Sequence, residues 1–254
     1  MPKHKLKQLL GEPYHSWERF HQKTKFKKWS PFPDPSLWPK SWGTTYFKDY
    51  PRLDKIILPE PGNLGKISLE EALINRKSHR KFSYKPLTLE QISDFLFFSC
   101  GMKDNNPPWV GNRTYPSPGG RYALEVYLIS QNSELPTGVY HYNLRSHSLD
   151  TLLSMQTFSS SFYFNQVWSE KASIFILVTA IFERNTIKYG QRGYRHVLEE
   201  AGHIGQNYYL VGTALEIGIC GIGGYVDDDL NTLLDVDGVR ESVVYVLGAG
   251  NKEK

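Results

Sequence analysis

The feature that most constrains the fold is a single stripe of apolar residues in the last third of the chain. Its positions are spaced 4, 3, 4, 3 and 4 residues apart, at Val197, Ala201, Ile204, Tyr208, Val211 and Leu215. This spacing predicts one face of an α-helix over six turns long, near residues 194–217. Gly202, Gly205 and Gly212 interrupt the pattern, and each costs about 0.8–1 kcal/mol relative to alanine in a helix. We therefore expect another helix or a flat ligand to pack closely against these glycines.

Further helices and strands are predicted around this helix. Capping boxes at Ser68 and Thr88 predict helices over 68–75 and Leu89–Cys100, the second ended by Gly101. Strand patterns occupy 124–130, 138–142, 173–182 and 242–247, and short helices are predicted near 165–170 and 227–234. Since strands and helices do not alternate regularly, the pattern predicts an α+β fold around a mixed sheet.

The N-terminal quarter differs from the rest in composition. Residues 1–67 are rich in proline and contain Trp17, Trp29, Trp38 and Trp42, so we interpret them as an arm packed on a single core of residues 68–254, with a short helix around 14–20. The first 28 residues carry a net charge of +6, whereas the whole chain carries +4. A basic arm can bind nucleic acid, but a solvated basic terminus is the more common case.

Composition excludes several classes of protein. The longest apolar run, 174–182, is too short for a membrane span, and no apolar signal core follows the N-terminus. Cys100 and Cys220 stand far apart, which argues against a dithiol or zinc site. We expect a protein of the cytoplasm that does not enter a membrane.

The first candidate site is a basic segment directly after the helix of residues 68–75. Arg76, Lys77, Ser78 and Arg80 place three fixed charges and a hydroxyl within five residues. Such a set suits a phosphate, because Arg donates paired hydrogen bonds, Lys adds a compact charge and Ser adds a neutral donor. An exposed basic turn explains the segment equally well. A nucleic-acid patch is disfavoured, because no aromatic residues alternate with the charges.

Glycine-rich segments offer main-chain amides at two further places. Residues 218–224, reading GICGIGG, do not fit Gly-x-Gly-x-x-Gly and have no strand signal before them, which excludes a Rossmann dinucleotide site. In this loop Gly223 and Gly224 would allow backbone N–H groups to approach a planar ring closely. Residues 116–120, reading PSPGG, are by composition simply a turn.

Two pairs of polar residues flank the start of the long helix. Lys188 and Tyr189 lie in the connection that precedes it, and burial that lowers the pKa of the lysine would make them a proton acceptor and donor. Most Lys-Tyr pairs are nevertheless ordinary surface residues. Glu200 and His203 have the spacing of half a di-iron site, but a matching second motif is lacking, so core or interface polar residues explain them better. We therefore expect no metal.

Read in order, these motifs resemble one known arrangement. The RxSxR motif from Arg76 to Arg80, followed by Phe82, and the PSxGG motif before a Leu-Glu-Val-Tyr strand are similar to the nitroreductase superfamily. Residues 184–207, reading RNTIKYGQRGYRHVLEEAGHIGQN, resemble the SagB-type dehydrogenase branch together with 221–224. The resemblance covers nearly the whole chain.

The resemblance implies an FMN-dependent oxidoreductase, with a mainly antiparallel sheet flanked by helices and a homodimer that holds FMN at the subunit interface. The FMN-binding residues it implies are Arg76, Lys77, Ser78 and Arg80 from one subunit, Ser117 and Gly119 from the partner, and Ile222, Gly223 and Gly224 near the flavin N5. Lys188 and Tyr189 match the acid/base pair of the azoline-oxidising members. A second basic group for the phosphate is common near the C-terminus of the superfamily, where this chain has Lys252 and Lys254.

Three functions are compatible with these features. The first, which the resemblance implies, is the dehydrogenation of thiazoline or oxazoline rings in a peptide to azoles, with a cyclodehydratase as partner. The second is a stand-alone flavin reductase that uses NAD(P)H on small nitro or quinone compounds. The third is a non-catalytic protein that binds nucleic acid through the basic arm.

Overall fold

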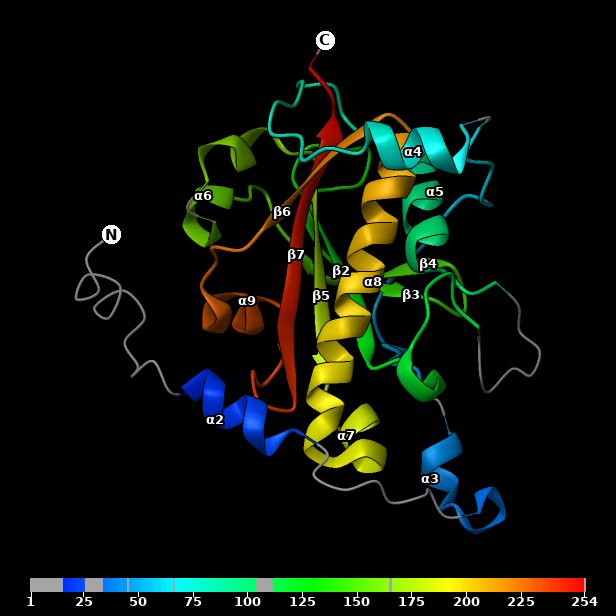
Figure 1. Ribbon diagram of the computed structural model, residues 1–254. Coiled ribbons are helices and arrows are strands. Elements are labelled where there is room, and N and C mark those ends of the chain that lie inside the picture. Colours follow the sequence, from blue (N-terminus) through cyan, green and yellow to red (C-terminus); the bar gives the residue numbers. More distant parts are fainter. Residues whose placement is uncertain are drawn as a thin grey trace.

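A seven-stranded sheet forms the centre of the protein. The structure is a computed structural model, and it describes residues 16–25, 34–44, 46–65, 67–103, 112–164 and 166–253. The strand order is β1-β4-β3-β2-β5-β7-β6 (Figure 1). The strands are β1 (Lys55–Ile57), β2 (Leu124–Ser130), β3 (Gly138–Asn143), β4 (Ser148–Ser154), β5 (Ile174–Ile181), β6 (Ile217–Ile222) and β7 (Glu241–Asn251). Neighbouring strands are antiparallel, which confirms the expected mainly antiparallel sheet.

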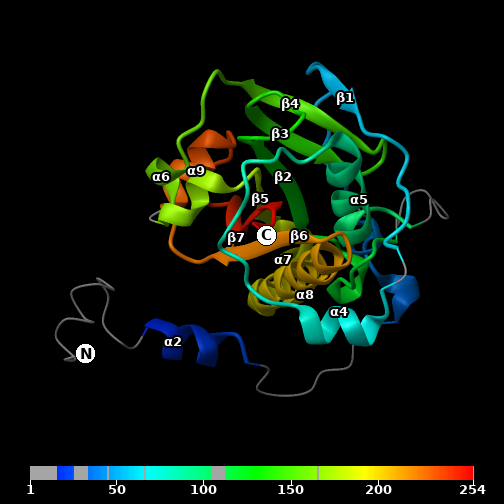
Figure 2. The same ribbon diagram turned by 90° about the horizontal axis from the view of Figure 1, so that it is seen from above.

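Helices lie on both faces of this sheet (Figure 2). One face carries α5 (Leu89–Cys100) and α8 (Gly193–Ala214), with α4 (Leu69–Asn75) against α8; the other carries α6 (Ser160–Tyr163) and α9 (Asp227–Leu233). Each face has its own apolar core, one containing Phe95 and Ile204, the other Phe164 and Leu230. The remaining helices are α2 (Ser16–Lys23), α3 (Lys40–Gly43) and α7 (Glu183–Tyr189), with 3-10 turns at η1 (Pro35–Leu37), η2 (Pro118–Gly120), η3 (Val167–Lys171) and η4 (Gly190–Arg192).

Both predicted capping boxes are present. The Ser68 hydroxyl accepts the Glu71 N–H at 3.1 Å, and the Thr88 hydroxyl accepts the Gln91 N–H at 3.2 Å, so α4 and α5 start where the sequence predicts. α5 ends at Gly101 as predicted. Only glycine fits at this position, because a Cβ there would lie 2.6 Å from the Phe97 carbonyl oxygen.

The long helix predicted from the apolar stripe is present as α8, whose 22 residues make just over six turns. It ends at Ala214, three residues before the predicted 217, since Glu216 turns the chain with a φ of +58° and β6 begins at Ile217. The stripe from Val197 to Val211 is buried against the sheet as expected.

Close packing explains two of the three glycines that interrupt the apolar stripe of α8. A Cβ at Gly205 would lie 2.8 Å from the Tyr245 ring, and one at Gly212 would overlap Ile219. The close packing is confirmed, although side chains of β7 and β6 supply it in place of a second helix or a flat ligand. A Cβ at Gly202 would meet nothing within 4 Å among the described residues, because this glycine lies on the exposed side of α8.

The prediction that 218–224 is a loop is wrong. Most of this segment is β6, an edge strand paired with β7, and only Gly223 and Gly224 lie beyond it. Glycine weakens strands, so its frequency here hid the strand signal. Gly218 is required by packing, since a Cβ there would lie 2.8 Å from the His79 ring.

Other boundaries also differ from the sequence predictions. β1 and β4 were not predicted, β7 extends four residues beyond 247 to Asn251, and the expected helix near 165–170 is the 3-10 turn η3. Lys188 and Tyr189 lie in the connection between β5 and α8 as predicted, and there they form the last turn of α7. Residue 165 lies outside the described residues.

Segments of the predicted arm contact the core at several places. β1 extends the sheet beside β4, the Arg195 side chain donates to the Thr24 hydroxyl at 2.7 Å, and the Phe20 ring lies 5.1 Å from that of Tyr194. Trp29 and residues 14–15 lie outside the described residues, and the domain boundary at residue 67 stays a prediction. Within the described ranges, no helix is long and apolar enough to cross a membrane.

A buried chain of charged side chains links the sheet to α7. His141 contacts Asp150 at 3.2 Å and Glu125 at 3.0 Å, and Glu125 pairs with Arg184 of α7. Lys55 of β1 completes the chain at Asp150. The network therefore fixes the helix that carries Lys188 and Tyr189.

Candidate active site

The basic segment follows α4 and runs beside β6. The His79 N–H donates to the Ile219 carbonyl at 2.7 Å, which ties the segment to the edge strand. Lys77, Ser78 and Arg80 are exposed and Arg76 is half-buried, so the charges stay available to a ligand. The Arg80 charge reaches Cys220, where burial nevertheless raises the pKa of the thiol.

Tyr209 of α8 joins this segment to the glycines of β6. Its hydroxyl accepts the Gly221 N–H at 2.7 Å and lies 3.3 Å from the Ser78 hydroxyl. The Arg76 guanidinium sits over the Tyr209 ring, 5.5 Å from its centroid. One side chain thus holds the basic segment against the strand that leads to Gly223 and Gly224.

Lys252, which follows β7, lies beside the basic segment and adds a further positive charge. Lys252 and Lys77 line a cavity of about 20 Å³ together with His79. Burial, and next to it the Lys252 and Lys77 charges, lower the pKa of His79, and its buried Nε2 has no hydrogen-bond partner among the described residues. The cluster therefore presents several cations, which suits an anionic group.

Ser117 and Gly119 lie towards the other end of α8. The Ser117 hydroxyl donates to Glu200 Oε2 at 2.7 Å and accepts the Tyr122 N–H at 2.8 Å. Gly119 adopts a φ of +65° and lies against Tyr189, whose ring atom Cζ would be 3.2 Å from a Cβ at this position. The PSxGG segment and the Lys-Tyr pair are therefore neighbours.

Lys188 is held under a tryptophan of the N-terminal segment. Its Nζ lies 4.1 Å from the centroid of the Trp38 ring. Burial lowers the pKa of Lys188, and the charge of Arg121 lowers it further. Arg121 is itself buried and donates to the carbonyls of Trp42 and Arg184 at 2.7 Å. A lysine with a lowered pKa gives up its proton more readily, and its neutral amine can then accept a proton from a substrate.

Within one chain these residues form two separate groups. We call Arg76, Lys77, Ser78, Arg80, Ile222, Gly223, Gly224 and Lys252 the basic group, and Ser117, Gly119, Lys188 and Tyr189 the Lys-Tyr group. Tyr209 contacts the basic group and Glu200 contacts the Lys-Tyr group. Glu200 and Tyr209 are nine positions apart in α8, which corresponds to roughly 14 Å along the helix axis.

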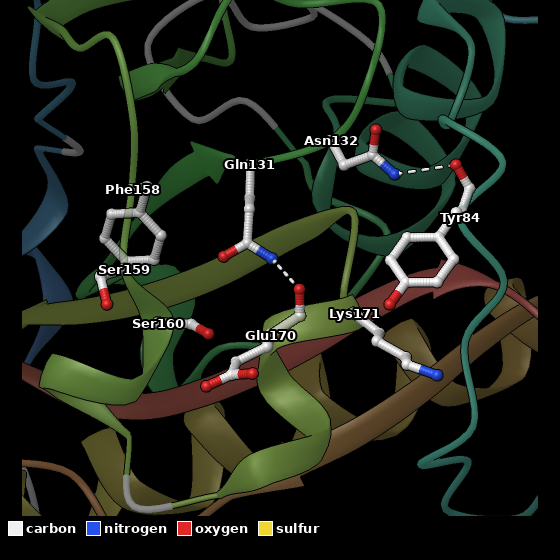
Figure 3. A pocket seen from close by; sticks show the side chains of 8 residues that line it. All are labelled: Tyr84, Gln131, Asn132, Phe158, Ser159, Ser160, Glu170 and Lys171. Carbon is white, nitrogen blue, oxygen red and sulfur yellow. Dashed lines mark hydrogen bonds between the residues drawn. The ribbon is translucent and has the colours of Figure 1, made fainter.

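A further pocket belongs to neither group. It measures about 570 Å³ and lies beside α6 and η3, where Phe158 and Lys171 are among its lining residues (Figure 3). Asn132 donates to the Tyr84 carbonyl and Gln131 to the Glu170 carbonyl, so part of the polar lining is already paired. Its lining includes no predicted site residue.

The fold is that of nitroreductases. The chain superposes on a nitroreductase-type crystal structure from Ralstonia eutropha with a TM-score of 0.68, at 24% identity, over 79% of this chain and 90% of that one. It also superposes on a chain of the Escherichia coli microcin synthetase McbBCD complex, solved with truncated pro-MccB17 bound, with a TM-score of 0.61 at 23% identity over 94% and 92% of the two chains.

The nitroreductase family model matches residues 73–251, and the chain belongs to this family of oxidoreductases. A nitroreductase-type relative, MJ1384 of Methanocaldococcus jannaschii, is 32% identical over 201 residues, which is 78% of this chain and 96% of the relative. The microcin B17-processing protein McbC of E. coli is 32% identical over 178 residues, 66% of this chain and 64% of McbC. The resemblance deduced from the motifs is thereby confirmed.

Several residues that support the two groups were not predicted as site residues from the sequence. Tyr209, Trp38 and Arg121 all act through contacts with residues far away in the chain. Lys252 was noted in the sequence only as one of two lysines near the C-terminus, where the superfamily often has a second basic group for the phosphate. Glu200 and His203, considered as polar core or interface residues, separate in the structure, since Glu200 is fully buried and His203 is exposed.

Proposed function

We propose that the chain is an FMN-dependent dehydrogenase that forms a homodimer and oxidises azoline rings in a peptide to azoles. The observation that carries this proposal is the Lys188–Tyr189 pair, in which Tyr189 lies against Gly119 of the PSxGG segment and burial lowers the pKa of Lys188. The similarity to McbC, which is named for the processing of microcin B17, supports a peptide as the substrate.

The residues of the basic group fit FMN. Three exposed or half-exposed cations and Lys252 match the charge of a phosphate, and the unpaired Nε2 of His79 lies beside them. A Cβ at Gly223 or Gly224 would meet no described residue within 4 Å, so their amides are open to a planar ring. When bound, FMN would supply the hydride acceptor of the reaction.

A homodimer accounts for the separation of the two groups. The exposed side of α8 carries Gly202, together with Leu198 at 43% and Tyr194 at 37% exposure. A second copy packed against this side by a two-fold axis would bring its Lys-Tyr group to the basic group of the first. Gly202, which has no packing role within the chain, would then permit close approach of the two helices.

Lys188 and Tyr189 would move the proton. In its neutral form the Lys188 amine would take a proton from the azoline ring. The Trp38 ring contacts this amine, and burial and the Arg121 charge lower its pKa. Burial raises the pKa of Tyr189, so its hydroxyl keeps its hydrogen and can donate a hydrogen bond to the ring. The stand-alone reductase is the second candidate, supported by the coverage of MJ1384, and it would not require this pair.

The test compares Lys188→Ala with Lys171→Ala, a lysine of the pocket beside η3. We expect both proteins to retain a flavin absorption spectrum and only Lys188→Ala to lose oxidation of an azoline-containing peptide. Full azoline oxidation by Lys188→Ala would refute the assignment. Rapid anaerobic bleaching of the flavin by NAD(P)H, without azoline oxidation by the unaltered protein, would favour the reductase.

A further inference from the structure

A buried carboxyl lies directly behind the PSxGG segment. Glu200 is 0% exposed, and its Oε2 accepts the Ser117 hydroxyl at 2.7 Å. Its other oxygen, Oε1, is buried and accepts no hydrogen bond from the described residues. A carboxylate in this setting is poorly compensated, because a buried charge is stabilised only where hydrogen bonds or opposite charges surround it.

The neighbouring charges do not neutralise Glu200. Arg113 is the nearest cation that acts on it, but its guanidinium donates to the Tyr115 hydroxyl at 2.7 Å and to the Leu124 carbonyl at 3.1 Å. Tyr115 keeps its hydrogen, since burial raises its pKa, and Cys100 of α5 does likewise. Burial raises the pKa of Glu200 to about 7, and this effect outweighs the lowering by the Ser117 hydroxyl, the Arg113 charge and the backbone N–H groups of Ala123 and Leu124.

The protonation of Glu200 decides which way the Ser117 hydroxyl points. Ser117 Oγ already accepts the Tyr122 N–H at 2.8 Å. When Glu200 is ionised, Ser117 must give its single hydrogen to Oε2. When Glu200 is protonated, the carboxyl O–H can donate to Oγ, and the hydroxyl hydrogen of Ser117 is released for another acceptor.

We infer that Glu200 is a positioning residue that offers the Ser117 hydroxyl to the ligand of the PSxGG segment only after taking up a proton from solvent. This inference rests on the proposed function, in which that ligand is the flavin. The switch transfers one proton and requires no other reactant. Its consequence is that flavin binds more tightly as the pH falls through 7, because a donor becomes available to it.

The experiment measures flavin binding to the flavin-free protein between pH 6 and 8. Riboflavin is the main probe, because it lacks the phosphate that titrates in this range in FMN. We expect the unaltered protein to bind riboflavin up to tenfold more tightly at pH 6 than at pH 8, about the value of one hydrogen bond. In Glu200→Gln the dependence disappears, because the amide has no proton to lose in either orientation.

Two further variants complete the test. Glu199→Gln, altered at a neighbouring exposed carboxyl, should keep the pH dependence. Ser117→Ala should lose it while Glu200 remains, so it carries the test if Glu200→Gln fails to fold. Equal pH dependence in the unaltered protein and either Glu200→Gln or Ser117→Ala would overturn the inference, as would a flat profile of the unaltered protein. If flavin binds with a flat profile, the proposed function survives; if neither FMN nor riboflavin binds, both fail.

Discussion

The contact between Gly119 and Tyr189 can be tested with two neighbouring glycines. Gly119 and Gly120 have nearly the same backbone, with φ values of +65° and +62°. A Cβ at Gly120 would meet nothing within 4 Å, whereas one at Gly119 would overlap the Tyr189 hydroxyl. Alanine substitutions at these two glycines therefore separate the free-energy cost of the left-handed backbone from the cost of the contact with Tyr189.

The expected magnitudes follow from these two costs. An alanine in the left-handed region costs about 1–2 kcal/mol, and Gly120→Ala should lose that much free energy of unfolding. Gly119→Ala should lose a further 1–3 kcal/mol or so, because the added methyl group overpacks the contact. Tyr189→Phe removes the overlapping oxygen and leaves the ring atoms beyond 3.0 Å, so the double variant Gly119→Ala/Tyr189→Phe should recover most of the additional loss.

Urea unfolding of the four variants, followed by circular dichroism at one protein concentration, gives the coupling free energy between the two positions. A coupling of about 1 kcal/mol or more would place the Lys-Tyr pair against the PSxGG segment in solution. The reasoning is refuted if Gly119→Ala and Gly120→Ala lose equal stability, or if Tyr189→Phe recovers none of the loss.

Two further predictions concern charged groups. Arg184 and His141 hold the pKa of Glu125 below its ordinary 4.5 despite burial, and His141 and Lys55 likewise lower that of Asp150 from 3.8. The stability these carboxylates contribute is therefore complete above those values and is lost as the pH falls below them. Glu125→Gln should lower the free energy of unfolding at pH 7 by about 3–5 kcal/mol and flatten the acid side of a pH series of urea titrations, whereas an unchanged acid side would contradict the assignment. Lys252→Gln should weaken FMN binding roughly three- to tenfold and leave riboflavin binding unchanged, because only FMN carries the phosphate; equal effects on both ligands, or an equal effect of the distant Lys171→Gln, would remove Lys252 from the phosphate site.

Local signals predicted those parts of the fold that depend on neighbouring residues. The capping boxes at Ser68 and Thr88 and the apolar stripe of α8 are each complete within one element, so sequence alone located them. The edge strand β6 was missed because its conformation is imposed from outside, by pairing with β7 and by the basic segment alongside it. Gly218 of this strand leaves room for the His79 ring, a contact that no local pattern indicates.

The candidate site divides in the same way. The segments around Arg76, Ser117 and Lys188 could be recognised as short sequence motifs, and the family membership they indicated is confirmed. Their division into two groups depends on the length of α8 and on contacts of Tyr209 and Glu200 across the fold. The burial of Glu200 is likewise a tertiary property, and the spacing to His203 alone indicated a different chemistry.

The position of β7 in the sheet has a consequence for how the chain is made. This strand is the last in the sequence, yet it lies between β5 and β6 and pairs with both. β1 is made before its partner β4, and Lys55 meets its partner Asp150 only 95 residues later. The apolar surface of β5 therefore stays without its final neighbour until residues 241–251 have been made. Such late, long-range pairing slows folding and exposes unpaired strand edges to aggregation, so newly made chains of this protein are expected to depend on chaperones more than a helical bundle of the same size.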